Sequence, residues 1–148
     1  VDRVNDVQKM RPFEILKTEW KKSLKGKKVA VWGLSFKPRT DDVREAPAKG
    51  VIEALLKAGA KVVTYDPVAM ESFAKAYSTM KIAYARSAYE ALEGVDALLV
   101  MTEWDEFRTA DLSLMNKAMK GNLIVDGRNI FERSETEEAG FKYYGIGV

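Results

Sequence analysis

The chain has 148 residues, close to the size of one domain, and its 47% hydrophobic and 31% charged residues are usual for a folded globular protein. It contains no cysteine and no histidine, which excludes disulfides, cysteine nucleophiles, zinc–thiolate sites and imidazole bases. The formal net charge is +2 and no long run of one sign appears, so we expect no nucleic-acid partner. The chain is poorly equipped for acid–base or nucleophilic catalysis on its own, and we expect no catalytic residue and no metal site.

The sequence shows neither a membrane segment nor a targeting segment. No apolar run approaches the ~18 residues that span a bilayer. The first five residues, 1–5, lack the apolar core of a signal peptide. We therefore expect no membrane partner and a cytoplasmic location. Because the first residue is valine instead of methionine, we expect an excised fragment or a processed product.

The first element is predicted to be an amphipathic helix over residues 5–24. The apolar residues of one face recur at spacings of three and four: Phe13, Leu16, Trp20 and Leu24. Pro12 interrupts this pattern, because proline cannot donate the helical hydrogen bond. The helix is therefore expected to kink at Pro12 or to start afresh near Arg11. If exposed, its apolar face would favour association.

From residue 28 onward, short apolar runs alternate with helical periodicity. In chain order the predicted elements are strand 29–32, helix 47–58, strand 61–65, helix 69–77, strand 82–84, helix 87–92, strand 97–101, helix 111–119, strand 122–126 and strand 142–145. Pro47 in a first turn and Gly59 after a last turn delimit the first of these helices. Ser87 followed by Glu90 predicts a capping box.

This alternation predicts an α/β fold. Repeated strand–helix–strand units give a doubly wound, Rossmann-like, mostly parallel sheet of about six strands, here preceded by an N-terminal helix. Ligands of such sheets bind beyond the carboxyl ends of the strands. Four segments follow strand ends in this way: 33–46, 66–68, 102–107 and 126–129.

The loop at 33–46 departs from a dinucleotide-binding loop. Such a loop needs glycines spaced G-x-G-x-x-G, and only Gly33 is present. The loop instead contains Lys37, Arg39 and Arg44, whose charges suit phosphate. The alternative is an ordinary charged loop.

The other three segments each allow two interpretations. Asp66 could hold a ribose hydroxyl or act as a helix cap or turn residue. Trp104 and Phe107 could line a groove or pack against a helix. Arg128, after the flexible Gly127, could clamp a phosphate or read a base edge, or form a surface salt bridge.

Taken together, the motifs resemble one family. They are Val4–Lys9, Gly33–Pro38 with Thr40–Pro47, Tyr65–Pro67, Thr102–Phe107 and Asp126–Arg128. In this order they are similar to the end of the central domain and the C-terminal domain of the UDP-glucose/GDP-mannose dehydrogenases. The segment Thr102–Asp105 favours members that act on UDP-glucose over those that act on UDP-N-acetylmannosamine or GDP-mannose, which remain the alternatives.

The resemblance implies a role within a larger enzyme. Family members oxidise the sugar C6 alcohol in two NAD-dependent steps, using an N-terminal NAD domain and a cysteine that this chain lacks. Residues 1–24 would end the central-domain helix, and 25–148 would form the UDP-sugar-binding domain. The fragment alone would be inactive, NAD would be bound mainly by the missing domain, and the full enzyme would form a homodimer.

The same resemblance implies roles for four side chains. Phe36 and Lys37 would contact UDP, with Lys37 near the diphosphate, and Arg128 would bind UDP from its turn. Arg44 would reach toward NAD across the domain interface. Two readings outside the family also remain: a stand-alone NAD domain, and a receiver-like signalling domain suggested by Asp41, Asp42, Asp66 and Thr102.

Overall fold

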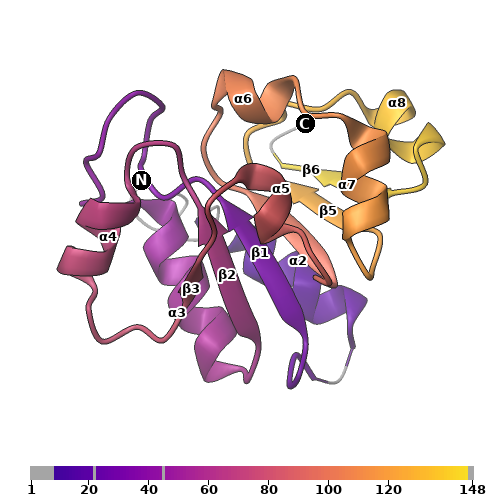
Figure 1. The fold of residues 1–148 in the computed structure, drawn as a ribbon. Helices are drawn as coiled ribbons and strands as arrows, with labels where there is room; N and C mark the ends of the chain where they lie inside the picture. Colours follow the sequence, from indigo (N-terminus) through magenta and orange to yellow (C-terminus); the bar gives the residue numbers. More distant parts are fainter. Residues whose placement is uncertain (1–8, 22, 45, 147–148) are drawn as a thin grey trace.

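The computed structural model describes residues 9–21, 23–44 and 46–146, which fold around one parallel sheet (Figure 1). The strands are β1 (Lys28–Trp32), β2 (Lys61–Tyr65), β3 (Ala83–Tyr84), β4 (Ala97–Val100), β5 (Leu123–Asp126) and β6 (Lys142–Gly145). They are ordered β3-β2-β1-β4-β5-β6, and every neighbouring pair is parallel. The order reverses between β1 and β4, so the doubly wound, Rossmann-like prediction is confirmed.

This strand order contradicts the receiver-like alternative. A flavodoxin-like receiver has the order 2-1-3-4-5, in which the third strand lies beside the first. Here β4 lies beside β1, and β3 lies at the sheet's edge. Asp41 and Asp42 are exposed, and the Thr102 hydroxyl is buried and donates to the Ser35 carbonyl. The supposed acidic pocket is therefore not assembled.

Helices cover both faces of the sheet (Figure 1). They are α2 (Arg11–Glu19), α3 (Pro47–Lys57), α4 (Met70–Ala76), α5 (Ala88–Ala91), α6 (Asp105–Arg108), α7 (Leu112–Ala118) and α8 (Arg133–Glu138). Side chains from α2, α3 and α4 form one apolar cluster, and those from α5, α6 and α7 form another. In the part of the chain that the structure describes, no helix is long and apolar enough to cross a membrane.

The central strands β1, β4 and β5 are buried on both faces, where successive side chains point to opposite sides of the sheet. In β1, Val29 and Val31 join the first cluster, and Ala30 and Trp32 join the second. The Trp32 ring stacks on Phe107 with centroids 4.7 Å apart and planes 19° apart. Phe107 is fully buried, so the packing interpretation of that residue is confirmed.

The N-terminal helix starts where Pro12 predicts but is shorter than expected. Helix α2 begins at Arg11 with the proline in its first turn, where no intrahelical donor is required. It ends at Glu19, and Lys21 takes a left-handed φ of 48°, so the predicted continuation to residue 24 is wrong. Leu16 is fully buried against the sheet instead of exposed for association. Residues 5–8 lie outside the described residues.

Two short helices, α6 and α8, have no counterpart among the predicted elements. Helix α8 has the sequence RSETEE, and its one buried side chain is Thr136, so it shows no apolar periodicity. The capping prediction at α5 holds in part. Ser87 accepts from the backbone N–H of Glu90 at 3.0 Å, while the Glu90 carboxylate accepts from Arg86 instead of Ser87.

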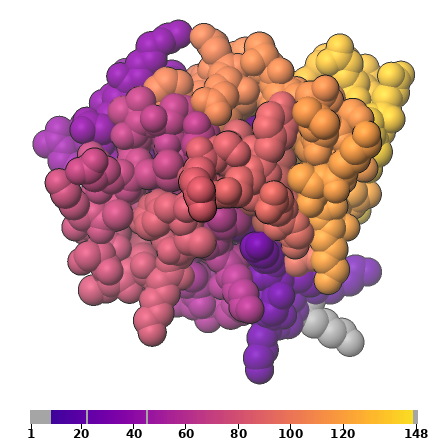
Figure 2. Space-filling model, in the orientation of Figure 1, coloured from indigo at the N-terminus to yellow at the C-terminus, as the bar shows by residue number. Residues whose placement is uncertain are grey.

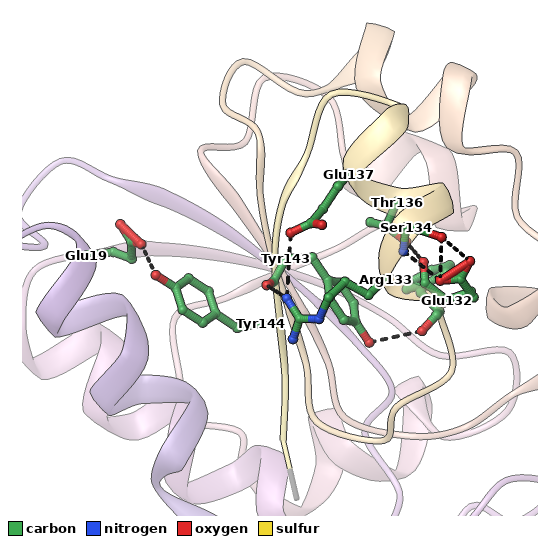
Figure 3. A network of polar contacts seen from close by, with 9 residues as sticks. Glu19, Glu132, Arg133, Ser134, Thr136, Glu137, Tyr143 and Tyr144 are labelled. Atoms are coloured by element: carbon green, nitrogen blue, oxygen red, sulfur yellow. Dashed lines mark hydrogen bonds and ion pairs between the residues drawn. The ribbon is translucent and has the colours of Figure 1, made fainter. Parts of the chain in front are cut away.

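Helix α2 is bound to the last strand through Glu19 (Figure 3). Its carboxylate accepts hydrogen bonds from the Tyr144 hydroxyl and from Lys142 Nζ, the latter at 3.0 Å. These donors lower the pKa of Glu19 below its ordinary value, Lys142 having the larger effect. A lowered pKa in the folded state stabilises the fold above the ordinary pKa, and this stabilisation is lost as the pH falls through the folded value.

We predict that Glu19→Gln lowers the free energy of unfolding at pH 7 by about 1 kcal/mol, because the charge-assisted bonds to β6 are weakened. Urea unfolding at pH 7 and at pH 3 measures this. The difference from the unsubstituted chain should be smaller at pH 3 than at pH 7, because the stabilisation by the Glu19 carboxylate decreases as the pH falls toward its lowered pKa. Glu14→Gln, on the exposed side of the same helix, is the control, and an equal difference at both pH values would contradict the prediction.

Candidate functional site

A cavity of about 410 Å³ opens at the carboxyl edge of the sheet. Its walls come from the segments that follow β1, β4, β5 and β6, together with the chain before β1 and the start of α3. The lining residues are Lys9, Pro12, Phe36, Pro47, Met101, Gly127, Arg128 and Ile146. This volume suits a nucleoside-sized ligand, and mostly apolar walls with a few cationic groups are typical of such sites.

Phe36 and Arg128, both predicted site residues, lie together in this cavity. The Arg128 guanidinium carbon lies 5.9 Å from the centroid of the Phe36 ring, and 44% of Phe36 is exposed. Arg128 Nη2 also donates to both oxygens of Glu103, at 2.8 and 2.9 Å. Arg128 thus forms the salt bridge that one interpretation predicts, and the two side chains of this bridge are only 28% and 30% exposed.

The turn that presents Arg128 is built around the buried carboxylate of Asp126. One oxygen accepts from the backbone N–H of Arg128 at 3.1 Å, and the other accepts from that of Phe131 at 2.9 Å. Gly127 is required here, because a Cβ would lie 2.8 Å from the carbonyl oxygen of Val100. The close approach of β4 and this turn therefore places Arg128 beside the cavity.

Tyr143, on the neighbouring strand β6, also contacts the Asp126 carboxylate. Its hydroxyl donates to Asp126 at 2.7 Å and is near the carbonyl of Phe131, at 3.1 Å. Burial, and then the Asp126 carboxylate, raise the pKa of Tyr143, so the hydroxyl keeps its proton and remains a donor. Arg133 donates to the Tyr143 carbonyl at 3.0 Å, which ties α8 to β6.

Asp66 organises the opposite side of the site. It is fully buried, and one oxygen accepts from the backbone N–H groups of Val68 and Ala69, at 2.8 and 2.7 Å. The other accepts from Leu34 N–H at 2.9 Å and from the Trp104 indole at 3.3 Å. Asp66 is therefore the turn residue that one interpretation predicts, and it also anchors the loop after β1.

The start of that loop is further restrained by β4. The Thr102 hydroxyl donates to the Ser35 carbonyl at 2.7 Å, and Ser35 Oγ donates to the Lys37 carbonyl at 2.6 Å. Gly33 has a φ of 102°, and a Cβ there would lie 2.7 Å from the backbone nitrogen of Thr102. These contacts place Phe36 at the cavity.

The structure does not bring the other two predicted residues into the cavity wall. The Lys37 side chain is exposed beside Phe36, and the residues described as lining the cavity do not include it. Arg44 is more distant along the loop and pairs with Asp42, at 3.1 Å. Arg39 pairs with Asp105 of α6 at 3.3 Å, so loop and helix lie side by side at the top of Figure 2.

Sequence reasoning missed several parts of the site. Glu103 lies within a motif that indicates no role for it, and Lys9 and Pro12 lie within a stretch that the sequence predicts to be a helix. A charged residue directly after a buried strand, opposite the arginine that follows the next strand, is the signal that points to Glu103. No local pattern indicates that the chain before β1 forms a cavity wall, because that contact depends on how α2 packs.

These residues do not fit the adenosine end of a dinucleotide cofactor. The ribose-binding acid of a Rossmann domain must be accessible, whereas Asp66 is fully buried and accepts four protein donors. Gly33 is the single glycine of a loop that needs three, and α3 starts only at Pro47. The stand-alone NAD-domain alternative therefore disagrees with the geometry.

Fold and cavity together define a Rossmann-like domain whose candidate site has cationic side chains, Lys9 and Arg128, instead of a glycine-rich loop. Residues 30–133 match the model of the UDP-glucose/GDP-mannose dehydrogenase family, UDP binding domain. The chain belongs to this family.

Curated relatives support the assignment. The UDP-glucose 6-dehydrogenase of Pseudomonas aeruginosa is 43% identical over 99% of this chain, and that of Rhizobium meliloti is 46% identical over 84%. The chain spans only 33% and 28% of these two relatives.

Solved structures agree with the fold. A UDP-glucose dehydrogenase from Pyrobaculum islandicum superposes with a TM-score of 0.80 at 31% identity, covering 97% of this chain and 30% of that one. A shikimate dehydrogenase from Aquifex aeolicus, at 18% identity and a TM-score of 0.65, covers 93% of this chain and 49% of its own, and shares the fold alone.

We predict that Asp66→Asn destabilises the fold by roughly 3 kcal/mol, because the amide must point its own N–H₂ at backbone or indole donors. Thermal and urea unfolding measure the loss. Asp41→Asn, at an exposed carboxylate of the neighbouring loop, should change stability by less than about 0.5 kcal/mol. Equal effects of the two substitutions would refute the anchoring role of Asp66.

Proposed function

We propose that this chain is the part of an NAD-dependent UDP-glucose 6-dehydrogenase that holds the UDP end of the substrate. The observation that carries the proposal is the cavity at the carboxyl edge, in which Phe36 and Arg128 meet. The family's UDP-binding domain model over residues 30–133 and the names of the two curated relatives support the nucleotide and the sugar.

In this proposal different side chains bind different parts of UDP. The exposed ring of Phe36 offers an apolar face to the uridine part. Arg128 supplies planar N–H donors, which suit phosphate or carbonyl oxygens, and Lys9 adds a second cation to the wall. Lys37, exposed beside Phe36, is proposed to lie near the diphosphate.

The oxidation itself is proposed to require parts of the enzyme outside this chain. The chain has no cysteine or histidine, and its loop geometry does not suit NAD. We propose that NAD is held elsewhere in the full enzyme, with Arg44 extending toward it from the exposed loop. Residues 1–24 are proposed to end a central-domain helix, 25–148 to form the UDP-sugar-binding domain, and the full enzyme to be a homodimer.

Isothermal titration calorimetry of this chain with UDP tests the proposal. We expect binding that is measurable, with a dissociation constant below about 1 mM. It should still be weak, because only part of the site is present. NAD and GDP, titrated separately, should bind at least about tenfold more weakly. Absence of heat with UDP at millimolar concentrations would contradict the proposal. Tighter binding of GDP would favour a GDP-mannose enzyme.

We predict that Arg128→Ala weakens UDP binding by about tenfold or more, because charge-assisted bonds to the ligand are lost. Arg86→Ala is the matched control, since this exposed arginine lies beyond the edge strand β3. The control should bind UDP as the unsubstituted chain does. If the two variants bind alike, Arg128 has no role in holding UDP.

A further inference from the structure

Three consecutive residues after β4 reach three different neighbouring segments. The Thr102 hydroxyl donates to Ser35 in the loop after β1, at 2.7 Å. The Glu103 carboxylate forms a salt bridge with Arg128 from the turn after β5. The Trp104 indole donates to Asp66 after β2, at 3.3 Å. This segment therefore connects the loop after β1, the turn after β2 and the turn after β5, and Glu103 contacts Arg128, which lines the cavity.

We propose that Thr102, Glu103 and Trp104 are positioning residues that hold Phe36 and Arg128 in the geometry that binds the nucleotide. The inference rests on the proposed function, since the ligand is UDP. Each residue acts through another: Thr102 through the Ser35 backbone, Trp104 through Asp66 and Leu34, and Glu103 through the guanidinium of Arg128.

The salt bridge with Glu103 restrains the conformation of the Arg128 side chain. Only 30% and 28% of the two side chains are exposed, and both carboxylate oxygens contact the single nitrogen Nη2. Within the described residues, Nη1 and Nε make no hydrogen bond, so they remain for a ligand. An arginine side chain loses rotamer entropy when it is fixed. A partner that fixes it in advance reduces this cost of binding.

Removing the Glu103 charge changes UDP affinity in opposite directions, depending on whether the carboxylate positions Arg128 or only repels the anionic ligand. A carboxylate that was only close to an anionic ligand would repel it, and removing the charge would tighten binding. A carboxylate that positions Arg128 does the opposite, and its removal weakens binding. Glutamine at this position keeps the size of the side chain and removes the charge.

The test is UDP titration of Glu103→Gln, with Glu93→Gln as the control for the same charge change. Glu93 is exposed and precedes β4, at the other edge of the sheet. We expect Glu103→Gln to bind UDP about tenfold more weakly and Glu93→Gln to bind unchanged. In a chain that also contains Arg128→Ala, Glu103→Gln should have no further effect. Unchanged or tighter binding by Glu103→Gln would overturn the positioning role of Glu103.

Thr102 gives an independent pair of variants. Thr102→Ser keeps the hydroxyl and should bind UDP as before, whereas Thr102→Val removes it and should weaken binding by about tenfold. Equal loss in both variants would show a packing role and overturn the proposal for Thr102. If Thr102→Val does not fold, Trp104→Phe, which keeps a ring and removes the N–H donor, takes its place with the same expected direction.

The outcomes distinguish the two proposals. Failure of the unsubstituted chain to bind UDP overturns the proposed function and the positioning role with it. UDP binding that is unaffected by Glu103→Gln and by Thr102→Val overturns the positioning role alone. Circular dichroism of each variant confirms that the comparison is between folded chains.

Discussion

Two buried carboxylates at strand ends determine the geometry of the carboxyl edge. Asp66 directly after β2 and Asp126 at the last position of β5 are both fully buried, and both accept backbone N–H groups from the turn that follows. An anion can remain in such a place only when several donors satisfy it, so the surrounding loops are restricted to conformations that supply them. Phe36 and Arg128 owe their positions to these loops.

Most of the fold was predictable from the sequence because its central strands β1, β4 and β5 are apolar runs separated by helical periodicity. The pattern of Val29–Trp32 and Ala97–Met101 indicates strands buried on both faces, and the structure has them so. Helix α8 was not predictable in this way, because charge and capping sustain it instead of an apolar face. The end of α2 depends on the left-handed turn at Lys21, which residue pattern does not indicate.

Some residues of the candidate site could likewise be predicted from the sequence, and others could not. Residues on strand ends, such as Arg128, could be placed at the carboxyl edge from topology alone. Residues whose roles depend on contacts between segments could not be assigned those roles from the sequence. Asp66 and Glu103 are single acidic residues in the sequence, and only the packing of four loops makes one an anchor and the other the partner of an arginine. Lys37 and Arg44 fit a cationic loop by composition, yet the fold leaves both side chains exposed.

The position of α2 links ligand occupancy to local opening of the chain. Lys9 and Pro12 form part of the cavity wall, and Glu19, at the other end of the same segment, is bound to β6. Detaching this helix from the sheet removes that part of the wall, so the detached form has less affinity for a ligand in the cavity. A ligand that binds only the closed form therefore raises the free energy of opening. Amide hydrogen exchange in α2, although distant in sequence from Arg128, is therefore expected to become slower when a ligand occupies the cavity.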